Sequence, residues 1–173
     1  MVKHPSILLI VLFCFMMSHG QRFKKIVLKD FQNKELTVFT KNFDELNVSE
    51  NLMVTYRDSL FRVNPDEIKY FTVNNVTYDS HIIDNKAVFL RRIEKGKVNL
   101  YLHQHSNFSV DTEDPSMIMQ ELKQEFYVSF QNKIYAINKS NYRTQLQSLL
   151  PNIEILPSEG FNDLTTIISR FND

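Results

Sequence analysis

Short runs of alternating apolar and polar residues fill the chain from Lys24 to about Ala136. Alternation with a period of two is typical of β-strands that bury one face, and turn-forming residues separate these runs. The pattern predicts strands over residues 25–28, 36–40, 53–56, 60–63, 70–73, 76–79, 87–93, 98–103, 126–130 and 134–136. About ten short strands at this near-regular spacing favour an antiparallel β-sandwich or open barrel.

Most connections between these runs carry asparagine or aspartate, and only the one at 94–97 has a glycine. The chain has 3 glycines, and Asn is the next best residue for left-handed backbone positions. We expect hairpin turns around residues 30–33, 57–59, 74–75, 94–97 and 131–133. Asn64 followed by Pro65 also predicts one helical turn, with Asn as the cap and Pro at the first helical position.

The apolar period changes to that of a helix in the last third of the chain. Ser140 is a candidate cap for a helix over 141–150 that Pro151 ends, and Ser158 is a candidate cap for a second helix. The apolar stripes are formed by Tyr142, Leu146, Leu149 and Leu150 in the first and by Phe161, Leu164, Ile167, Ile168 and Phe171 in the second. Helices this short are unstable alone in water, so both must pack against the sheet, which predicts an α+β fold.

The segment from Ser109 to Gln124 fits neither period. Met117, Ile118 and Leu122 suit a short helix or a loop that crosses one end of the sheet. No internal repeat or Pro/Ser-rich linker divides the chain. Residues 21–173 are therefore expected to form a single domain, with a β-rich body over 21–137 and a helical tail over 138–173.

The first residues of the chain have the features of a secretory signal peptide. A weakly positive start precedes an apolar run over Ile7–Met17, and small residues, Ser18 and Gly20, stand before Gln21. The run is shorter than the roughly 20 residues that a membrane-spanning helix needs. We expect residues 1–20 to be removed and the mature protein to be exported, to the periplasm or outside the cell, with no membrane span left.

Composition excludes several classes of function. Cys14 lies inside the apolar run and is the only cysteine, so the mature chain has no thiol for disulfides, thiolate–metal bonds or a cysteine nucleophile. The 20 basic residues balance the 20 acidic ones, which argues against a nucleic-acid partner. Gly96 and Gly160 are the glycines left after position 20, too few for phosphate-binding loops, dinucleotide folds or nucleophile elbows.

The sequence His103-Gln104-His105 is the best candidate for chemistry. Residues i and i+2 of a strand share a face and stand roughly 6.5–7 Å apart, so two imidazoles there can bind one metal ion. A catalytic zinc site needs a third protein ligand. His81, Asp111 and Glu113 are candidates, and the spacing favours none of them.

Tyr101, His103 and His105 also define a candidate ligand face, because alternation places all three on one side of a strand. Aromatic and imidazole groups on a sheet face can stack on a sugar or grip a peptide. The same pattern fits a plain solvated face or a face covered by the C-terminal helices. The sequence therefore assigns no catalytic, cofactor-binding or metal-ligating residue, and gives these three only as a speculative ligand face.

Several short motifs resemble those of a known group of proteins. They are Pro65–Ile68, Phe71–Val73, Phe89–Leu90 and Leu100–Tyr101, followed by a tail with Tyr142, Pro151 and Phe171-Asn172. The chain resembles small exported β-rich proteins of Bacteroidetes-type bacteria, which have a helical tail and no assigned function. The resemblance implies a location in the cell envelope and no activity.

These observations predict an exported binding or structural module of the cell envelope, without identifiable catalytic machinery and without a cofactor. Its expected partner is an unidentified envelope protein, peptide or glycan, and not a nucleic acid. The competing hypothesis is a metal-assisted hydrolase that uses His103 and His105 on a strand.

Overall fold

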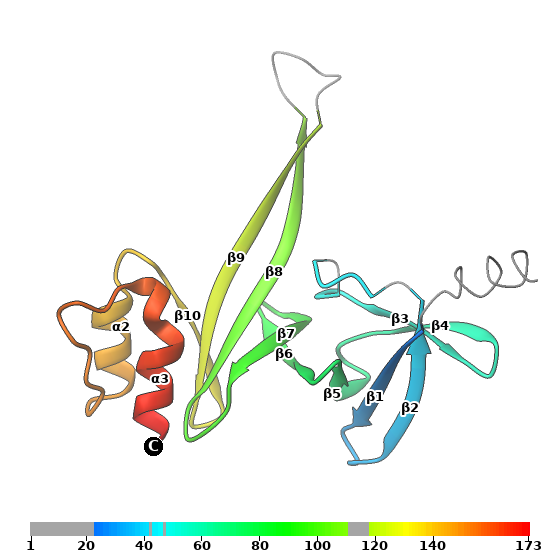
Figure 1. The fold of residues 1–173 in the computed structure, drawn as a ribbon, viewed down its shortest axis with the longest axis horizontal. Coiled ribbons are helices and arrows are strands. Elements are labelled where there is room, and N and C mark those ends of the chain that lie inside the picture. The colour runs from blue at the N-terminus through cyan, green and yellow to red at the C-terminus, as the bar shows by residue number, and fades with distance from the viewer. Residues whose placement is uncertain (1–22, 42, 47, 111–117) are drawn as a thin grey trace, which may run out of the picture.

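The computed structural model describes residues 23–41, 43–46, 48–110 and 118–173 (Figure 1). The predicted signal peptide, with Cys14, lies outside these residues, as do two candidate metal ligands, Asp111 and Glu113. In the described part of the chain, no helix has the length and apolar character that crossing a membrane requires.

Ten strands form one antiparallel sheet, as the alternating pattern predicts. They are β1 (Lys24–Asp30), β2 (Glu35–Thr40), β3 (Leu52–Tyr56), β4 (Ser59–Val63), β5 (Ile68–Val73), β6 (Val76–Ile83), β7 (Lys86–Glu94), β8 (Asn99–Val110), β9 (Ile118–Phe130) and β10 (Lys133–Ile137). Their order across the sheet is β10-β9-β8-β7-β6-β5-β1-β2-β3-β4, so strands that follow one another in sequence pair except where β5 returns to β1. The sheet does not close, because β10 and β4 stand at opposite edges.

Asparagine holds most of the left-handed turn positions among the described residues, as the scarcity of glycine predicts. Asn33, Asn74, Asn75 and Asn132 have φ angles of 65°, 49°, 64° and 61°, in the left-handed region. Asn85 (φ 65°) makes a further turn, between β6 and β7, that the sequence analysis did not predict.

A single hydrogen-bonded turn stands where one helical turn is predicted at Asn64, but it is not assigned as helix. In this turn the Glu67 amide donates to the Asn64 carbonyl at 3.1 Å. The Glu67 carboxylate in turn accepts from the Asn64 amide at 2.8 Å. These bonds satisfy the turn locally, and β5 begins one residue later, before a second turn of helix can follow.

The region around Leu122 is a strand, so the expected short helix or crossing loop is wrong there. β8 and β9 pair from Asn99↔Ser129 to Val110↔Ile118, and this hairpin extends beyond the rest of the sheet as an arm (Figure 1). Cross-strand backbone bonds hold the arm, which is why its sequence needs no alternation of apolar residues.

Two helices follow the sheet, α2 (Tyr142–Leu149) and α3 (Leu164–Asn172), and a 3-10 turn, η1 (Phe161–Asp163), leads into α3. The predicted caps are wrong. Asn141 stands at the start of α2 in place of Ser140. The turn η1 begins three residues after Ser158, and Asp163 Oδ2 accepts from the Gly160 amide at 2.7 Å.

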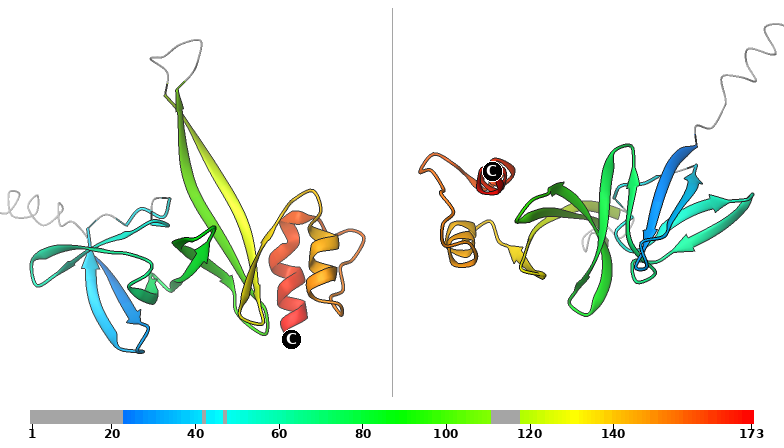
Figure 2. Two further views of the ribbon diagram at one scale, coloured as in Figure 1. Left: turned by 180° about the vertical axis from the view of Figure 1, so that it is seen from behind. Right: turned by 90° about the horizontal axis from the view of Figure 1, so that it is seen from below.

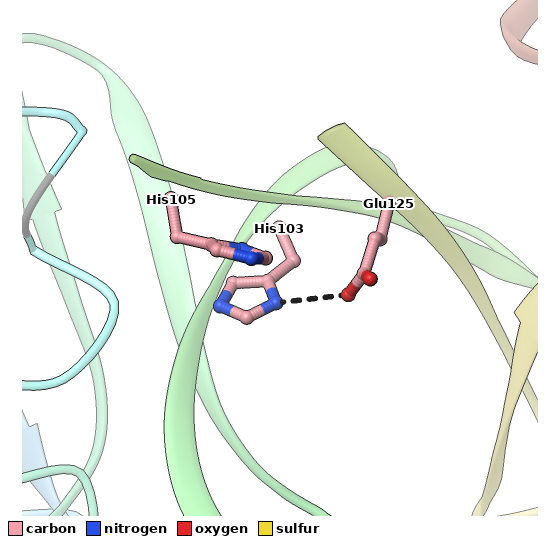
Figure 3. A group of neighbouring side chains, drawn as sticks. All are labelled: His103, His105 and Glu125. Atoms are coloured by element: carbon pink, nitrogen blue, oxygen red, sulfur yellow. Dashed lines mark ion pairs between the residues drawn. The ribbon is translucent and has the colours of Figure 1, made fainter. Parts of the chain in front are cut away.

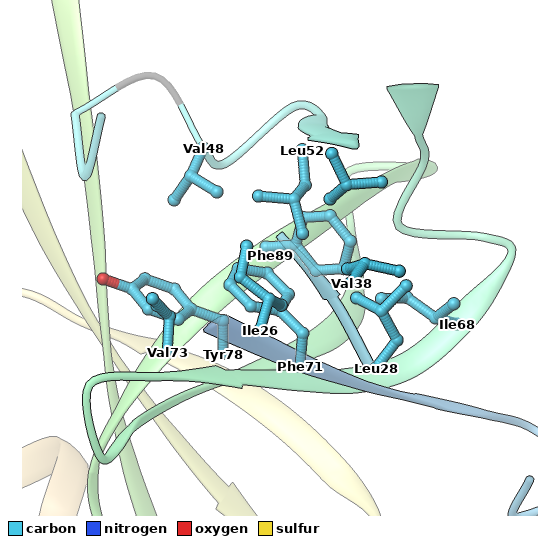
Figure 4. Packing of buried hydrophobic residues seen from close by; sticks show 11 residues of the cluster. Ile26, Leu28, Val38, Val48, Leu52, Ile68, Phe71, Val73, Tyr78 and Phe89 are labelled. Atoms are coloured by element: carbon cyan, nitrogen blue, oxygen red, sulfur yellow. The ribbon is translucent and has the colours of Figure 1, made fainter. Parts of the chain in front are cut away.

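The hydrophobic core has two main parts. The first lies over β1, β5, β6 and the loop before β3, where the rings of Phe71 and Tyr78 stack at 4.8 Å (Figure 4). In the second, α2 and α3 lie side by side at the other end of the sheet (Figure 2). Leu146 and Ile167 pack there with Leu100 of β8 and Val128 of β9, all fully buried, which confirms that the helices pack on the sheet.

Candidate metal centre

A fork between β7 and β8 forms the candidate site. The two strands pair at Arg92↔Tyr101 and Arg91↔Leu102, and among the described residues their pairing ends at Leu102. Beyond this point another segment takes over the edge of β7, because the Phe89 amide donates to the Ser49 carbonyl at 2.8 Å. The strand β8 therefore leaves its neighbour directly before His103.

A cleft of about 660 Å³ occupies this fork. Such a volume is within the usual range for a small-molecule or cofactor site. Three segments line it: the loop before β3, the β6–β7 hairpin and the β8–β9 arm. The polar or charged groups of the lining include Glu50, Lys86, His103, His105 and Glu125.

The β8–β9 register supplies a third candidate ligand that the sequence analysis missed. His103 lies directly opposite Glu125, and Tyr101 lies opposite Tyr127. The signal that was available is the hairpin register itself, since strands that pair through 99↔129 also bring 103 to 125. The sequence analysis started this strand at residue 126 and so left Glu125 outside it. In the structure the strand, β9, begins at Ile118.

His103, His105 and Glu125 form a cluster with the composition of a metal site (Figure 3). One nitrogen or oxygen from each residue lies within 4.8 Å of the other two. Around Zn²⁺, ligand atoms at 2.0–2.1 Å in tetrahedral geometry stand about 3.3 Å from one another. His103 Nδ1 and Glu125 Oε2 are already 3.5 Å apart, so small side-chain rotations bring the remaining atoms to a shared ion.

The histidine nitrogens are available for a ligand. Among the described residues, the Nδ1 atoms of His103 and His105 are buried without a hydrogen-bond partner. The contact between His103 Nδ1 and Glu125 has the distance of an ion pair but not the geometry of a hydrogen bond. Buried polar atoms are almost always partnered, so two unpartnered nitrogens that share one cleft are candidates to bind a ligand there.

Burial lowers the pKa of His103, and the neighbouring His105 lowers it further, against the opposing effect of Glu125. The imidazole is therefore neutral at neutral pH. A neutral ring keeps a nitrogen lone pair, which metal coordination requires.

Glu125 is held as a carboxylate and oriented by its neighbours. Burial raises its pKa, but hydrogen bonds from Lys123 and Tyr127 outweigh that effect and leave the pKa below its ordinary value. Lys123 Nζ lies 3.1 Å from Oε1, and the Tyr127 hydroxyl donates to Oε2 at 3.0 Å. Burial also raises the pKa of Tyr127, so its hydroxyl stays protonated as a donor. Such outer partners fix the direction of a ligating side chain.

The structure separates the three residues of the predicted ligand face. His103 and His105 come together, with ring centroids 4.8 Å apart. Tyr101 is 3% exposed and packs edge-on against His81 at 4.6 Å, so these two form a neighbouring buried contact. The helices cover the opposite face of β8, through Leu100, and leave the histidine face to the cleft.

Comparisons with known proteins return no match: no family model, curated protein or solved structure matches the chain. The function of the site is therefore inferred from its own geometry and chemistry.

Proposed function

We propose that the protein is an exported binding module whose ligand is a divalent transition-metal ion, held by His103, His105 and Glu125. The observation that carries the proposal is the convergence of three ligand atoms within 4.8 Å in a cleft. Two imidazoles and one carboxylate suit Zn²⁺ in particular.

The electrostatics of the site support a cation. The two imidazoles can supply nitrogen lone pairs, and the Glu125 carboxylate supplies negative charge in a half-buried position. Alkaline-earth ions prefer sites made entirely of oxygen ligands. A mixed nitrogen and oxygen set is more typical of zinc and its transition-metal neighbours.

The place of action follows from the chain's first residues. The apolar run over Ile7–Met17 supports export to the periplasm or the outside of the cell. There the module would present its site to an envelope protein, peptide or glycan. Of the two architectures predicted from the strand pattern, we favour the open barrel, since one continuous sheet contains all ten strands.

A metal-assisted hydrolase is the second candidate. Catalytic zinc sites have three protein ligands and keep one position for water, and the three ligands here line an open cleft. Zinc-dependent turnover of model ester or phosphoester substrates, lost in His103→Ala, would support this candidate over the binding module.

Calorimetric titration of the exported, EDTA-stripped protein with Zn²⁺ tests the proposal. We expect one equivalent of Zn²⁺ to bind, and binding to be lost in His103→Ala and in His105→Ala. His81→Phe is the matched control, because it removes a histidine outside the site and keeps an aromatic ring against Tyr101. Absence of binding in the parent protein, or its persistence in both alanine variants, would overturn the proposal.

A further inference from the structure

Glu50 is one of the acidic residues that line the same cleft as His103 and His105. It belongs to the loop before β3, and the backbone on both sides of it is fixed. Ser49 is 4% exposed and bonds to β7 through its carbonyl, and Leu52, 3% exposed, begins β3. The side chain itself is 62% exposed, so Glu50 has an anchored backbone and a movable carboxylate.

The present partner of Glu50 holds it weakly. Lys86 Nζ lies 2.6 Å from Glu50 Oε1, and both side chains are 62% exposed. Exposed ion pairs of this kind contribute about 0–1 kcal/mol. The hydrogen bond and the charge of Lys86 are the main causes of a lowered Glu50 pKa, with smaller effects from Arg62 and His103. Glu50 is thus an ionised carboxylate within electrostatic reach of the metal centre.

We infer that Glu50 is the fourth protein ligand of the metal ion: its side chain leaves Lys86 and turns its carboxylate toward His103 and His105, while the backbone of the loop before β3 stays in place. This inference rests on the proposed function. It explains why an acidic side chain on a fixed loop lines the same cleft as His103 and His105.

The charge balance of the site favours four ligands. With His103, His105 and Glu125 alone, a divalent ion leaves one uncompensated positive charge in a half-buried cleft. A second carboxylate ligand neutralises the ion and its ligands, while Lys86 and Lys123 keep their charges on side chains that are more than half exposed. Burying an unpaired charge is costly. Four protein ligands are also the usual set of a closed zinc site, which has no position for a reactive water.

Asp84 is the competing carboxylate in the cleft and supplies the matched control. It lies in the β6–β7 turn, with a φ of 49°. Glu50 follows Ser49, whose carbonyl bonds to Phe89 on the edge of β7 that β8 leaves directly before His103. Asp84 lies instead in the turn at the far end of the β6–β7 hairpin. We therefore assign the fourth position to Glu50 and expect Asp84→Asn to bind metal as the parent does.

Titration of the exported protein with Co²⁺, followed by the visible absorption of the bound ion, tests the assignment of Glu50. We expect Glu50→Gln to weaken Co²⁺ binding by more than about tenfold. About tenfold is the smallest loss usually seen when a residue that only contacts a metal ligand is removed. We also expect added azide to change the spectrum of Co²⁺ in Glu50→Gln and not in the parent, because only the variant has an open position. Hydrogen exchange at residues 48–51 should slow on metal addition in the parent alone.

The possible failures are distinguishable. If the parent does not bind Co²⁺ or Zn²⁺, the proposed function itself fails. If the parent binds and His103→Ala does not, but Glu50→Gln keeps the parent's affinity and its indifference to azide, only the role of Glu50 is overturned. If Asp84→Asn weakened metal binding and Glu50→Gln did not, the role of Glu50 would be overturned as well.

Discussion

Asn172, at the end of α3, hydrogen-bonds both backbone groups of Val98, the residue before β8. Its Oδ1 accepts from the Val98 amide at 2.9 Å, and its Nδ2 donates to the Val98 carbonyl at 2.9 Å. Val98 is fully buried, so water does not replace these bonds. The last turn of the last helix therefore fixes the start of the strand that carries His103 and His105.

We predict that Asn172→Ala lowers the free energy of unfolding by about 1–3 kcal/mol, because it leaves buried backbone groups of Val98 without partners. Urea unfolding measures the change. Asn152→Ala is the control, since Asn152 is exposed on the surface near α3. Equal stability of the Asn172→Ala variant and the parent would show that the two bonds contribute nothing.

Gly96 is needed because Asn172 occupies the space beside it. A Cβ at position 96 would stand 2.2 Å from the Asn172 Cγ, so Gly96→Ala must displace the side chain that holds Val98. We expect Gly96→Ala to destabilise the parent and to cost much less in an Asn172→Ala background, with a coupling of about 0.5–3 kcal/mol. Strictly additive effects in this double-mutant cycle would contradict the steric account.

Asp79 and Arg92 form a buried ion pair next to β8, the strand that carries His103 and His105. Arg92 Nε donates to Asp79 Oδ2 at 2.6 Å, a second guanidinium nitrogen bonds Oδ1, and Asp79 is 7% exposed. Arg92→Ala leaves a buried carboxylate unpaired, which costs about 3–5 kcal/mol.

The neighbouring Arg91→Ala is the matched control for Arg92→Ala. Arg91 contacts Glu45 at 3.6 Å, and about a third or more of each side chain is exposed. Its removal is expected to cost no more than about 1 kcal/mol. Denaturant unfolding of both variants compares the two costs, and similar values would refute the distinction between the buried and the exposed pair.

His81 makes the protein less stable in mild acid. Burial lowers its folded-state pKa, with Asp79 opposing and Arg92 adding to the effect, so the folded pKa lies below the unfolded value of about 6.5. The unfolded chain then binds more protons in that interval, and stability is lost as the pH falls below about 6.5 toward the folded-state pKa.

We expect His81→Phe to flatten this loss of stability, because Phe keeps the ring contact with Tyr101 and cannot be protonated. Some loss of stability with falling pH remains in this variant, since burial lowers the pKa of His103 as well. Urea unfolding at pH 7.5, 6.5 and 5.5 in EDTA is the measurement. Parallel stability curves for His81→Phe and the parent would exclude His81 as a cause.

Local features of the fold were predictable because their causes are local. Asn74 and Asn75 can adopt left-handed backbone angles wherever they occur, and the helical stripe around Leu146 is set by its own spacing. The ten strands and two helices follow from such signals. The Ser140 and Ser158 caps failed, because small shifts of a helix start depend on tertiary contacts that sequence patterns do not contain.

The site was only half predictable. His103 and His105 share a face by spacing alone, but Glu125 joins them through pairing across the hairpin. In the sequence Ile118–Gln124, apolar residues do not alternate regularly with polar ones, so no pattern marks the start of β9 as a strand. Glu50 is further removed, since it reaches the cleft only through the contact between Ser49 and Phe89.

The gain in stability on adding Zn²⁺ to Glu125→Gln, beside the parent and Glu121→Gln, tests the metal centre most directly. Glu121 is an exposed residue of the same strand and serves as the control. At 100 times the dissociation constant, an ion that binds only the folded form adds about 2.7 kcal/mol to the free energy of unfolding. We predict this gain in the parent and in Glu121→Gln and its loss in Glu125→Gln at the same zinc concentration. An undiminished gain in Glu125→Gln would contradict the metal centre.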